Sequence, residues 1–281
     1  MVIAGILCLA MGLVYYFFTQ DTPEGNFQEL KEKGEVPLLK KDEASFSSVL
    51  KDYRVWILFF VYAACFGIEL TVYGTMDDYL QNRFGLDRTF AGNLVLSFAL
   101  MNIFARTLGG YFGDKFGNTK GVRGRVLFLA VMLGAEGLML SFFSMTTSIA
   151  VGMVFLIAFS LTVQMAEGAT FSVVPFINKK AIGSISGIVG AGGNVGAFLA
   201  ALLLKSKSAV AESSALVKSN GLGEEAMKAA QTAASASAVS AGYFLIGGCI
   251  LLAALLSLAI KFTGSKQVVT SNKLNVLLAD K

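Results

Sequence analysis

The sequence predicts an all-α polytopic membrane protein with seven transmembrane helices, and three observations carry that prediction. Hydrophobic residues make up 55% of the 281 residues, charged residues only 15%, and the mean hydropathy is +0.66, which is unlike an ordinary soluble domain. Crossing a hydrocarbon core of ~30 Å takes about 20 residues, and only helices satisfy their own backbones there singly. Seven apolar runs have about this length: roughly 2–18, 55–76, 91–113, 126–145, 149–177, 182–204 and 241–260.

The first run and the segment after it suggest a division into two bundles. Residues 2–18, "VIAGILCLAMGLVYYFF", lack a basic leading region and a small-residue cleavage pattern, so we expect a retained helix and not a signal peptide. Residues 19–54 are long, charged and poor in aromatics, as a linker would be. We therefore expect 1–18 to be the last helix of an N-terminal bundle, 19–54 a cytoplasmic central linker and 55–262 a C-terminal six-helix bundle, with 263–281 a cytoplasmic tail.

The last two apolar runs are joined by residues 205–240, which are rich in Ala, Ser and Lys. This composition has only weak helical character and suits an extramembrane segment. We expect a solvated loop there.

The distribution of Lys and Arg predicts the orientation. Loops on one side carry 16 of the 23 Lys and Arg residues and loops on the other carry six, with Arg106 inside a helix. The richer side is expected to be cytoplasmic, which places the N-terminus outside and the C-terminus inside. A twelve-helix transporter without its first five helices has this arrangement, and so does an intact seven-helix receptor.

Sequence motifs bear on these alternatives. The last run, 241–260, has no lysine for a retinal Schiff base, and neither D-R-Y nor N-P-x-x-Y occurs. A receptor-like protein therefore remains only an alternative, together with a truncated product that has no transport activity of its own.

The titratable composition excludes several chemistries. The chain has no histidine, and its three cysteines all lie in apolar runs, so we expect no metal, no cofactor and no enzymatic centre. Any proton chemistry must then fall to carboxylates. The net charge of +4 is small and dispersed, so we expect membrane lipid and no nucleic acid as a partner.

Arg106 is the charge that most needs an explanation. It lies within "SFALMNIFARTLGGYFG", where an unpaired charge costs ~2.5–3.5 kcal/mol on insertion scales. Asn102 lies one turn earlier on the expected face, and Gly109 and Gly110 would let a neighbouring helix approach. Arg106 is either paired with a buried carboxylate such as Glu69 or Glu136, or it offers its planar fork to an oxyanion.

A second set of polar and aromatic residues lies on the preceding run. Steps of four, three and four place them on one helical face: Tyr62, Phe66, Glu69 and Tyr73. Such a face suits a partly polar cavity. Glu136 and Glu167 are two further carboxylates in apolar runs, and each is either an ion-pair partner or a proton site.

The stretch "SGIVGAGGNVGAFLAALLL" combines many glycines with an apolar setting. It does not follow the phosphate-binding spacing G-x-G-x-x-G, because position 195 is Val, and no strand precedes it. As a helix it would carry two ridges of small residues that allow close packing: Gly183, Gly187 and Ala191, and Gly192, Gly196 and Ala200. Asn194 would be the polar group on this smooth surface.

Several segments together resemble a known family. "GGYFGDKFGNTKGVRGR", with Gly110, Asp114 and Gly117 at G-x-x-x-D-x-x-G spacing, is similar to the short cytoplasmic helix-to-helix loop of the major facilitator superfamily. "YRVWILFFVYAACFGIELTVYG", "AGNLVLSFALMNIFARTLGGYFGD", "MAEGATFSVVPFINKK" and "GSISGIVGAGGNVGAF" resemble its nitrate/nitrite porter family, in particular the eukaryotic high-affinity nitrate transporters. The linker from "DTPEGNFQELK" is similar as well.

The resemblance implies a function and a site. The chain would correspond to helices 6–12 of the twelve-helix fold, and would transport nitrate or nitrite by alternating access in symport with protons, in the plasma membrane. The implied substrate residues are Arg106 as the anion ligand, Tyr62 and Phe66 as lining aromatics, and Gly192, Gly193, Asn194 and Gly196 in the signature helix. The family's second arginine and first signature belong to the N-terminal half, which this chain lacks, so that half is an implied partner.

Overall fold

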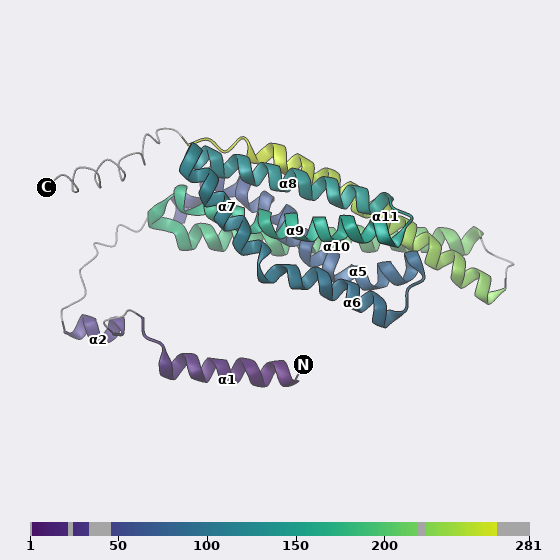
Figure 1. The fold of residues 1–281 in the computed structure, drawn as a ribbon, viewed down its shortest axis with the longest axis horizontal. Coiled ribbons are helices and arrows are strands. Elements are labelled where there is room, and N and C mark those ends of the chain that lie inside the picture. The colour runs from purple at the N-terminus through teal and green to yellow at the C-terminus, as the bar shows by residue number, and fades with distance from the viewer. Residues whose placement is uncertain (1, 22–24, 34–45, 219–222, 263–281) are drawn as a thin grey trace. The chain divides into compact units, whose positions relative to one another are not determined.

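The structure is a computed structural model that describes residues 2–21, 25–33, 46–218 and 223–262. The chain divides into two units, Met1–Glu43 and Ala44–Lys281, and each is described by itself. The first unit contains α1 (Val2–Phe18) and α2 (Phe27–Glu32), at the purple end of the chain (Figure 1). The tail expected over 263–281 and residues 22–24 and 34–45 of the expected linker lie outside the described residues.

Among the described residues, six helices are long and apolar enough to cross a membrane, and α1 contributes a shorter apolar helix, Gly5–Phe18. The seven runs expected from the sequence therefore all fall in helices, and the prediction of an all-α polytopic membrane protein is confirmed. The six spans are Tyr53–Phe84, Arg88–Lys120, Val122–Met145, Ile149–Phe176, Lys179–Leu216 and Glu224–Ser257.

The first span contains a π-helical turn. A short helix α3 (Phe46–Leu50) precedes α4 (Tyr53–Tyr62), which continues through η1 (Ala63–Gly67) into α5 (Ile68–Phe84). The Asp52 carboxylate accepts the backbone N–H of Arg54 and so caps α4, and Gly85 ends α5 in the left-handed conformation, with φ 67°. The regular helix expected here is therefore interrupted by one wider turn, a feature that often marks functional sites.

The second span is broken where the sequence predicted a continuous helix. α6 (Arg88–Leu100) ends in a 3₁₀ turn, η2 (Met101–Ile103), and α7 (Ala105–Lys120) begins after Phe104. Asn102 and Arg106 thus belong to different elements and not to one regular helix. The break lies directly before the arginine, so it helps to set the direction of that side chain.

The remaining helices complete a bundle around a buried aromatic and aliphatic core. They are α8 (Val122–Met145), α9 (Ile149–Val173), η3 (Val174–Phe176), η4 (Lys179–Ala181), α10 (Ile182–Lys218) and α11 (Glu224–Ser257). α8 packs against α9 and α11, α10 packs against α11, α4 and η1, and α7 packs against α9. Tyr243, Phe143 and Phe159 are the largest fully buried side chains of this core.

The expectation of a solvated loop over 205–240 is wrong. α10 runs to Lys218 and α11 begins at Glu224, so both helices continue well past the bundle, as Figure 1 shows at their green ends. The 37 residues of α10 extend about 55 Å at 1.5 Å per residue, against ~30 Å of hydrocarbon. The two extensions contact each other, since the Ser208 and Ser235 hydroxyls lie 3.0 Å apart.

Candidate functional site

Arg106 lies in the first turn of α7, and α9 supports the backbone break in front of it. The Ser160 hydroxyl donates to the Phe98 carbonyl at 2.9 Å, and the Gln164 amide donates to the same oxygen at 3.5 Å. Both side chains are fully buried. Because a helix break leaves carbonyl groups without their usual partners, these two bonds stabilise the geometry that aims Arg106.

Arg106 is held by two carboxylates from two other elements. Its Nη2 forms an ion pair with Glu167 of α9, and it donates to Oε2 of Glu69 of α5 at 3.5 Å. The Asn102 amide donates to Oε1 of Glu69 at 3.0 Å. The partner expected from the sequence, Glu69, is therefore present, Glu167 is a second one, and Glu136 forms no ion pair with Arg106 within the described ranges.

The cluster has a buried side and an open side. The side chains of Glu167 and Glu69 are 0% and 7% exposed, whereas that of Arg106 is 38% exposed. The Nε of Arg106 is itself buried and has no hydrogen-bond partner among the described residues. Part of the Arg106 side chain is thus exposed, whereas the Nε donor without a partner is buried, and so are the two carboxylates.

Aromatic rings form the wall next to this guanidinium. Arg106 lies over the Phe66 ring, 5.7 Å from its centroid, and Phe66 stacks on Tyr62 at 5.2 Å with nearly parallel planes. Phe171 of α9 contacts Tyr62 edge to face at 5.1 Å. The structure therefore brings Tyr62, Phe66, Glu69 and Arg106 together, and it adds Phe171, which the sequence analysis did not identify.

The glycine-rich run of α10 packs directly on this wall. A Cβ at Gly193 would overlap the Phe66 ring and press on Tyr62, at 3.1 Å. Gly192 and Gly196 face the carbonyl oxygens of Phe59 and Ala63 so closely that neither could carry a side chain. This ridge is therefore a tight helix contact with α4 and η1, as its small residues predicted.

The other predicted ridge is not packed. Gly183 and Gly187 have no atom within 4 Å of an added Cβ, and Ala191 is exposed, so the expected contact along Gly183, Gly187 and Ala191 is absent from the described part of the bundle. Asn194 is exposed as well. This face of α10 is open, whereas the opposite face lines the aromatic wall.

A second close crossing fixes the backbone of Arg106 itself. A Cβ at Gly168 of α9 would overlap the carbonyl oxygen of Arg106, and a Cβ at Gly109 of α7 would overlap the carbonyl oxygen of Met165. The close approach expected at Gly109 is confirmed. Gly168 was missed, although a polar stripe beside it at i, i+4 and i+7 spacing, Ser160, Gln164 and Glu167, was a visible signal in an apolar run.

Glu136 stands apart from the cluster. It lies on α8, is 0% exposed, and neither of its carboxyl oxygens has a hydrogen-bond partner in the described structure. Tyr73, also predicted on the polar face, is half exposed and has its ring 6.4 Å from that of Phe98.

The loop motif forms a separate polar contact at the far end of α7. Asp114 forms an ion pair with Arg125 of α8, and a Cβ at Gly117 would clash with the Arg125 guanidinium. Arg125 in turn lies over the Phe176 ring at 4.6 Å, while Gly110 has open space around its Cα. The motif therefore links α7, α8 and η3, with Arg125 as the residue between them.

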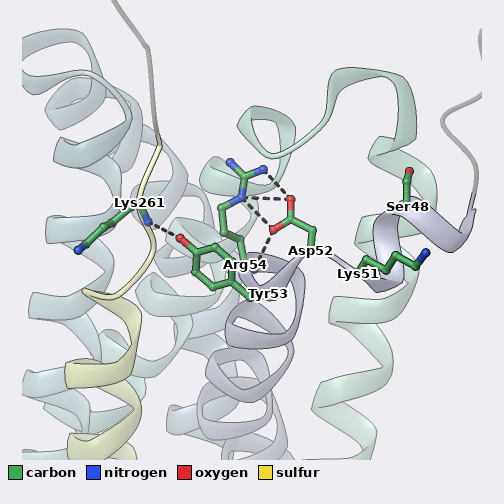
Figure 2. A pocket seen from close by; sticks show the side chains of 6 residues that line it. All are labelled: Ser48, Lys51, Asp52, Tyr53, Arg54 and Lys261. Atoms are coloured by element: carbon green, nitrogen blue, oxygen red, sulfur yellow. Dashed lines mark hydrogen bonds and ion pairs between the residues drawn. The ribbon is translucent and has the colours of Figure 1, made fainter.

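A surface hollow near the start of α4 contains none of the predicted substrate residues. Figure 2 shows Asp52 and Arg54 paired in it, beside Tyr53, Lys261, Ser48 and Lys51. The Arg54 guanidinium hydrogen-bonds the Asp52 carboxylate, at 2.9 Å from Nε to Oδ1, and holds the pKa of that carboxyl below its usual range. The hollow is thus organised by an ion pair that caps a helix.

Comparisons with known proteins agree with the architecture. The sequence profile of the Major Facilitator Superfamily matches residues 1–201. The chain is 36% identical over 203 residues to "High affinity nitrate transporter 2.5" of Arabidopsis thaliana, covering 72% of this chain and 40% of that protein. It is 33% identical over 215 residues to "High affinity nitrate transporter 2.7" of the same plant, covering 72% and 44%.

A relative that matches over a shorter stretch has a similar printed name. "Nitrate/nitrite transporter NrtP" of Picosynechococcus sp. is 38% identical over 153 residues, which cover 54% of this chain and 28% of that protein. No solved structure matches the chain. The chain spans about two fifths of the length of the first curated relatives it matches.

Proposed function

The chain belongs to the Major Facilitator Superfamily and, within it, to the nitrate/nitrite porter family, and from this premise we propose that it is the C-terminal part of a transporter for nitrate or nitrite. The printed names of the relatives support this substrate. The described six-helix bundle would work with an N-terminal bundle, of which α1 is the last helix, and the two would alternate access to a site between them. Transporters of this kind hold substrate near the membrane midplane, where two halves meet.

One observation carries the assignment of the site: the side chain of Arg106 is 38% exposed and lies on the Phe66 ring, and its buried Nε has no hydrogen-bond partner among the described residues. A planar fork of N–H donors matches the geometry of a planar oxyanion better than the point charge of a lysine does. The Tyr62 and Phe66 rings would form one wall of the anion site, and the Gly192–Gly196 stretch of α10, with Asn194, would lie next to that wall.

Proton coupling would use the buried carboxylates. Glu69, Glu136 and Glu167 are the candidates, because the chain has no histidine. The excess of Lys and Arg on one set of loops supports a cytoplasmic C-terminus, and the plasma membrane is the location that the family resemblance implies. The packed glycines of α10 would provide the smooth surface on which helices shift.

The experiment is Arg106→Lys in the transporter that contains this chain. Lysine keeps the charge and loses the paired donors, and one charge-assisted hydrogen bond contributes about 1.5–3 kcal/mol, so nitrate affinity should fall about 10- to 100-fold. Uptake of labelled nitrate is the measurement, with the amount of protein in the membrane determined in parallel.

Arg88→Lys is the matched control, since Arg88 is exposed at the first residue of α6. It should leave uptake unchanged. Wild-type rate and affinity in Arg106→Lys would refute the ligand role.

A further inference from the structure

Both carboxylates of the cluster hold the same nitrogen of Arg106. Glu167 and Glu69 each contact Nη2, while Nε has no hydrogen-bond partner in the described part of the chain. A guanidinium offers two edges with paired donors, one made by Nε and Nη2 and the other by Nη1 and Nη2. Nη2 has two N–H groups, one on each edge, and both carboxylates contact this atom, so an anion that binds either edge in a bidentate way competes with them for these N–H groups.

The charges around Nη2 do not balance when both carboxylates are ionised. One guanidinium then faces two buried negative groups, which both contact the same nitrogen atom, Nη2. Like charges at this range disfavour double ionisation. A single proton shared by Glu69 and Glu167 makes the cluster neutral, with Arg106 positive and one carboxylate negative.

The other titratable groups that face the pair supply no positive charge. They are Tyr62 of α4, Cys65 of η1 and Glu136 of α8, and the Gly192–Gly196 stretch of α10 has no titratable side chain. Once the Arg106 guanidinium binds an anion, none of these groups can replace it as the positive partner of the carboxylate that is still ionised. A buried ionised carboxyl without a counter-charge is costly, and the group neutralises instead.

We propose that anion binding at Arg106 is linked to the uptake of one proton by the Glu69–Glu167 pair. The anion takes the place of the carboxylates at Nη2, and a proton from water forms an O–H bond on the carboxylate that was ionised. The cluster is neutral before and after, because the positive guanidinium exchanges one negative partner for another. This inference rests on the proposed function and assigns its proton coupling to two named residues that act as a unit.

Two measurements on the purified transporter that contains this chain, in lipid nanodiscs, test this linkage. The first is equilibrium binding of labelled nitrate as a function of pH, and the second is the number of protons taken up on adding nitrate in weak buffer with an indicator dye. Wild type should take up one proton per nitrate bound, and its affinity should fall about tenfold for each pH unit of increase, as one linked proton requires.

Substitutions separate a shared proton from a single proton site. Glu69→Gln and Glu167→Gln each leave one carboxylate on Arg106, so each single variant should still take up one proton per nitrate. The double variant has no carboxyl to protonate, and it should bind nitrate with no proton uptake and no dependence on pH. Glu136→Gln tests whether the third buried carboxyl takes part in proton uptake. Glu224→Gln is the control for loss of an exposed carboxylate, and it should behave as wild type.

Each outcome decides a different point. Nitrate binding through Arg106 that is independent of pH in wild type would overturn the linkage and leave the proposed function standing. Abolition of proton uptake by Glu136→Gln, or by one single variant of the pair, would overturn the shared site. No nitrate binding at any pH, with Arg106→Lys indistinguishable from wild type, would overturn the proposed function together with this inference. The pH dependence of nitrate affinity in wild type needs no variant, so this measurement decides the linkage even if the double variant does not fold.

Discussion

Gly168→Ala is expected to disturb both the stability of the bundle and the anion site. Gly168 of α9 faces the carbonyl oxygen of Arg106, and an added Cβ would also lie 2.8 Å from the backbone nitrogen of Gly110. Both neighbours are backbone atoms, so no side chain can turn away to make room. α7 and α9 must therefore separate, and Arg106 moves with α7.

The magnitude follows from the kind of clash. Inserting a methyl group where the surroundings cannot yield costs typically about 1–3 kcal/mol. At about 2–4 °C per kcal/mol for a protein of this size, the apparent melting temperature should fall by roughly 2–12 °C. Nitrate affinity should fall as well, because the guanidinium leaves its position over Phe66.

Gly134→Ala is the matched control on α8. No atom lies within 4 Å of a Cβ added there, and alanine raises helix propensity by about 1 kcal/mol in a helix interior. Melting of the purified chain in detergent, followed by size-exclusion chromatography after heating, compares the two variants. If Gly168→Ala melts at or above the temperature of Gly134→Ala, the close crossing of α7 and α9 is not present in the protein.

Three further predictions concern the glycine ridges, the helix cap and the activity of the chain by itself. Gly196→Leu should destabilise the bundle and block transport, because Gly196 packs directly on the Ala63 backbone of η1, whereas Gly187→Leu should leave stability unchanged. Equal melting temperatures would contradict the assignment of the ridges. The hydrogen bond from Arg54 lowers the pKa of Asp52, so the contribution of this pair to stability is present above about pH 4 and is lost as pH falls through the folded-state pKa of Asp52. Melting temperatures of wild type and Asp52→Asn should therefore differ at neutral pH and converge in acid. A constant difference at all pH values would count against the pair. The 281-residue chain by itself should not transport nitrate into liposomes, since one bundle offers no second wall or gate, and saturable proton-driven uptake above empty liposomes would show that it is complete in itself.

The sequence predicted the parts of the fold that depend on local composition. Apolar runs identified every long helix in the described part of the chain. The insertion cost of Arg106 indicated that its charge must be offset, either by a buried carboxylate or by an oxyanion, and the structure shows two carboxylates in contact with it. The identity of that partner depends on long-range packing: Glu69, Glu136 and Glu167 look equivalent in the sequence, and only the crossing of α7 with α9 selects Glu167 as the second partner of Arg106.

The irregular turns could not be predicted for a different reason. No proline or glycine marks the 3₁₀ break at Met101–Ile103, which persists because Ser160 and Gln164 supply donors from another helix. The helices over 205–218 and 224–240 were missed because their Ser and Lys content outweighed their alanines, although alanine has the highest helix propensity. Contact between the two extensions, as at Ser208 and Ser235, adds a tertiary contribution that composition does not reveal.

One face of α9 connects these features into a single unit. Residues at steps of four, three and four along it contact the Phe98 carbonyl, the Arg106 guanidinium and the Tyr62 ring: Ser160, Gln164, Glu167 and Phe171. The same helix, α9, therefore contacts both the break in the second span and the aromatic wall of the first span. If α9 shifts during a transport cycle, the arginine, its carboxylate and the wall must shift with it, because the glycine crossing at Gly168 leaves α7 no room to slide independently. The anion site then moves as one body with α9, and protonation at Glu167 acts on the helix that positions every other part of the site.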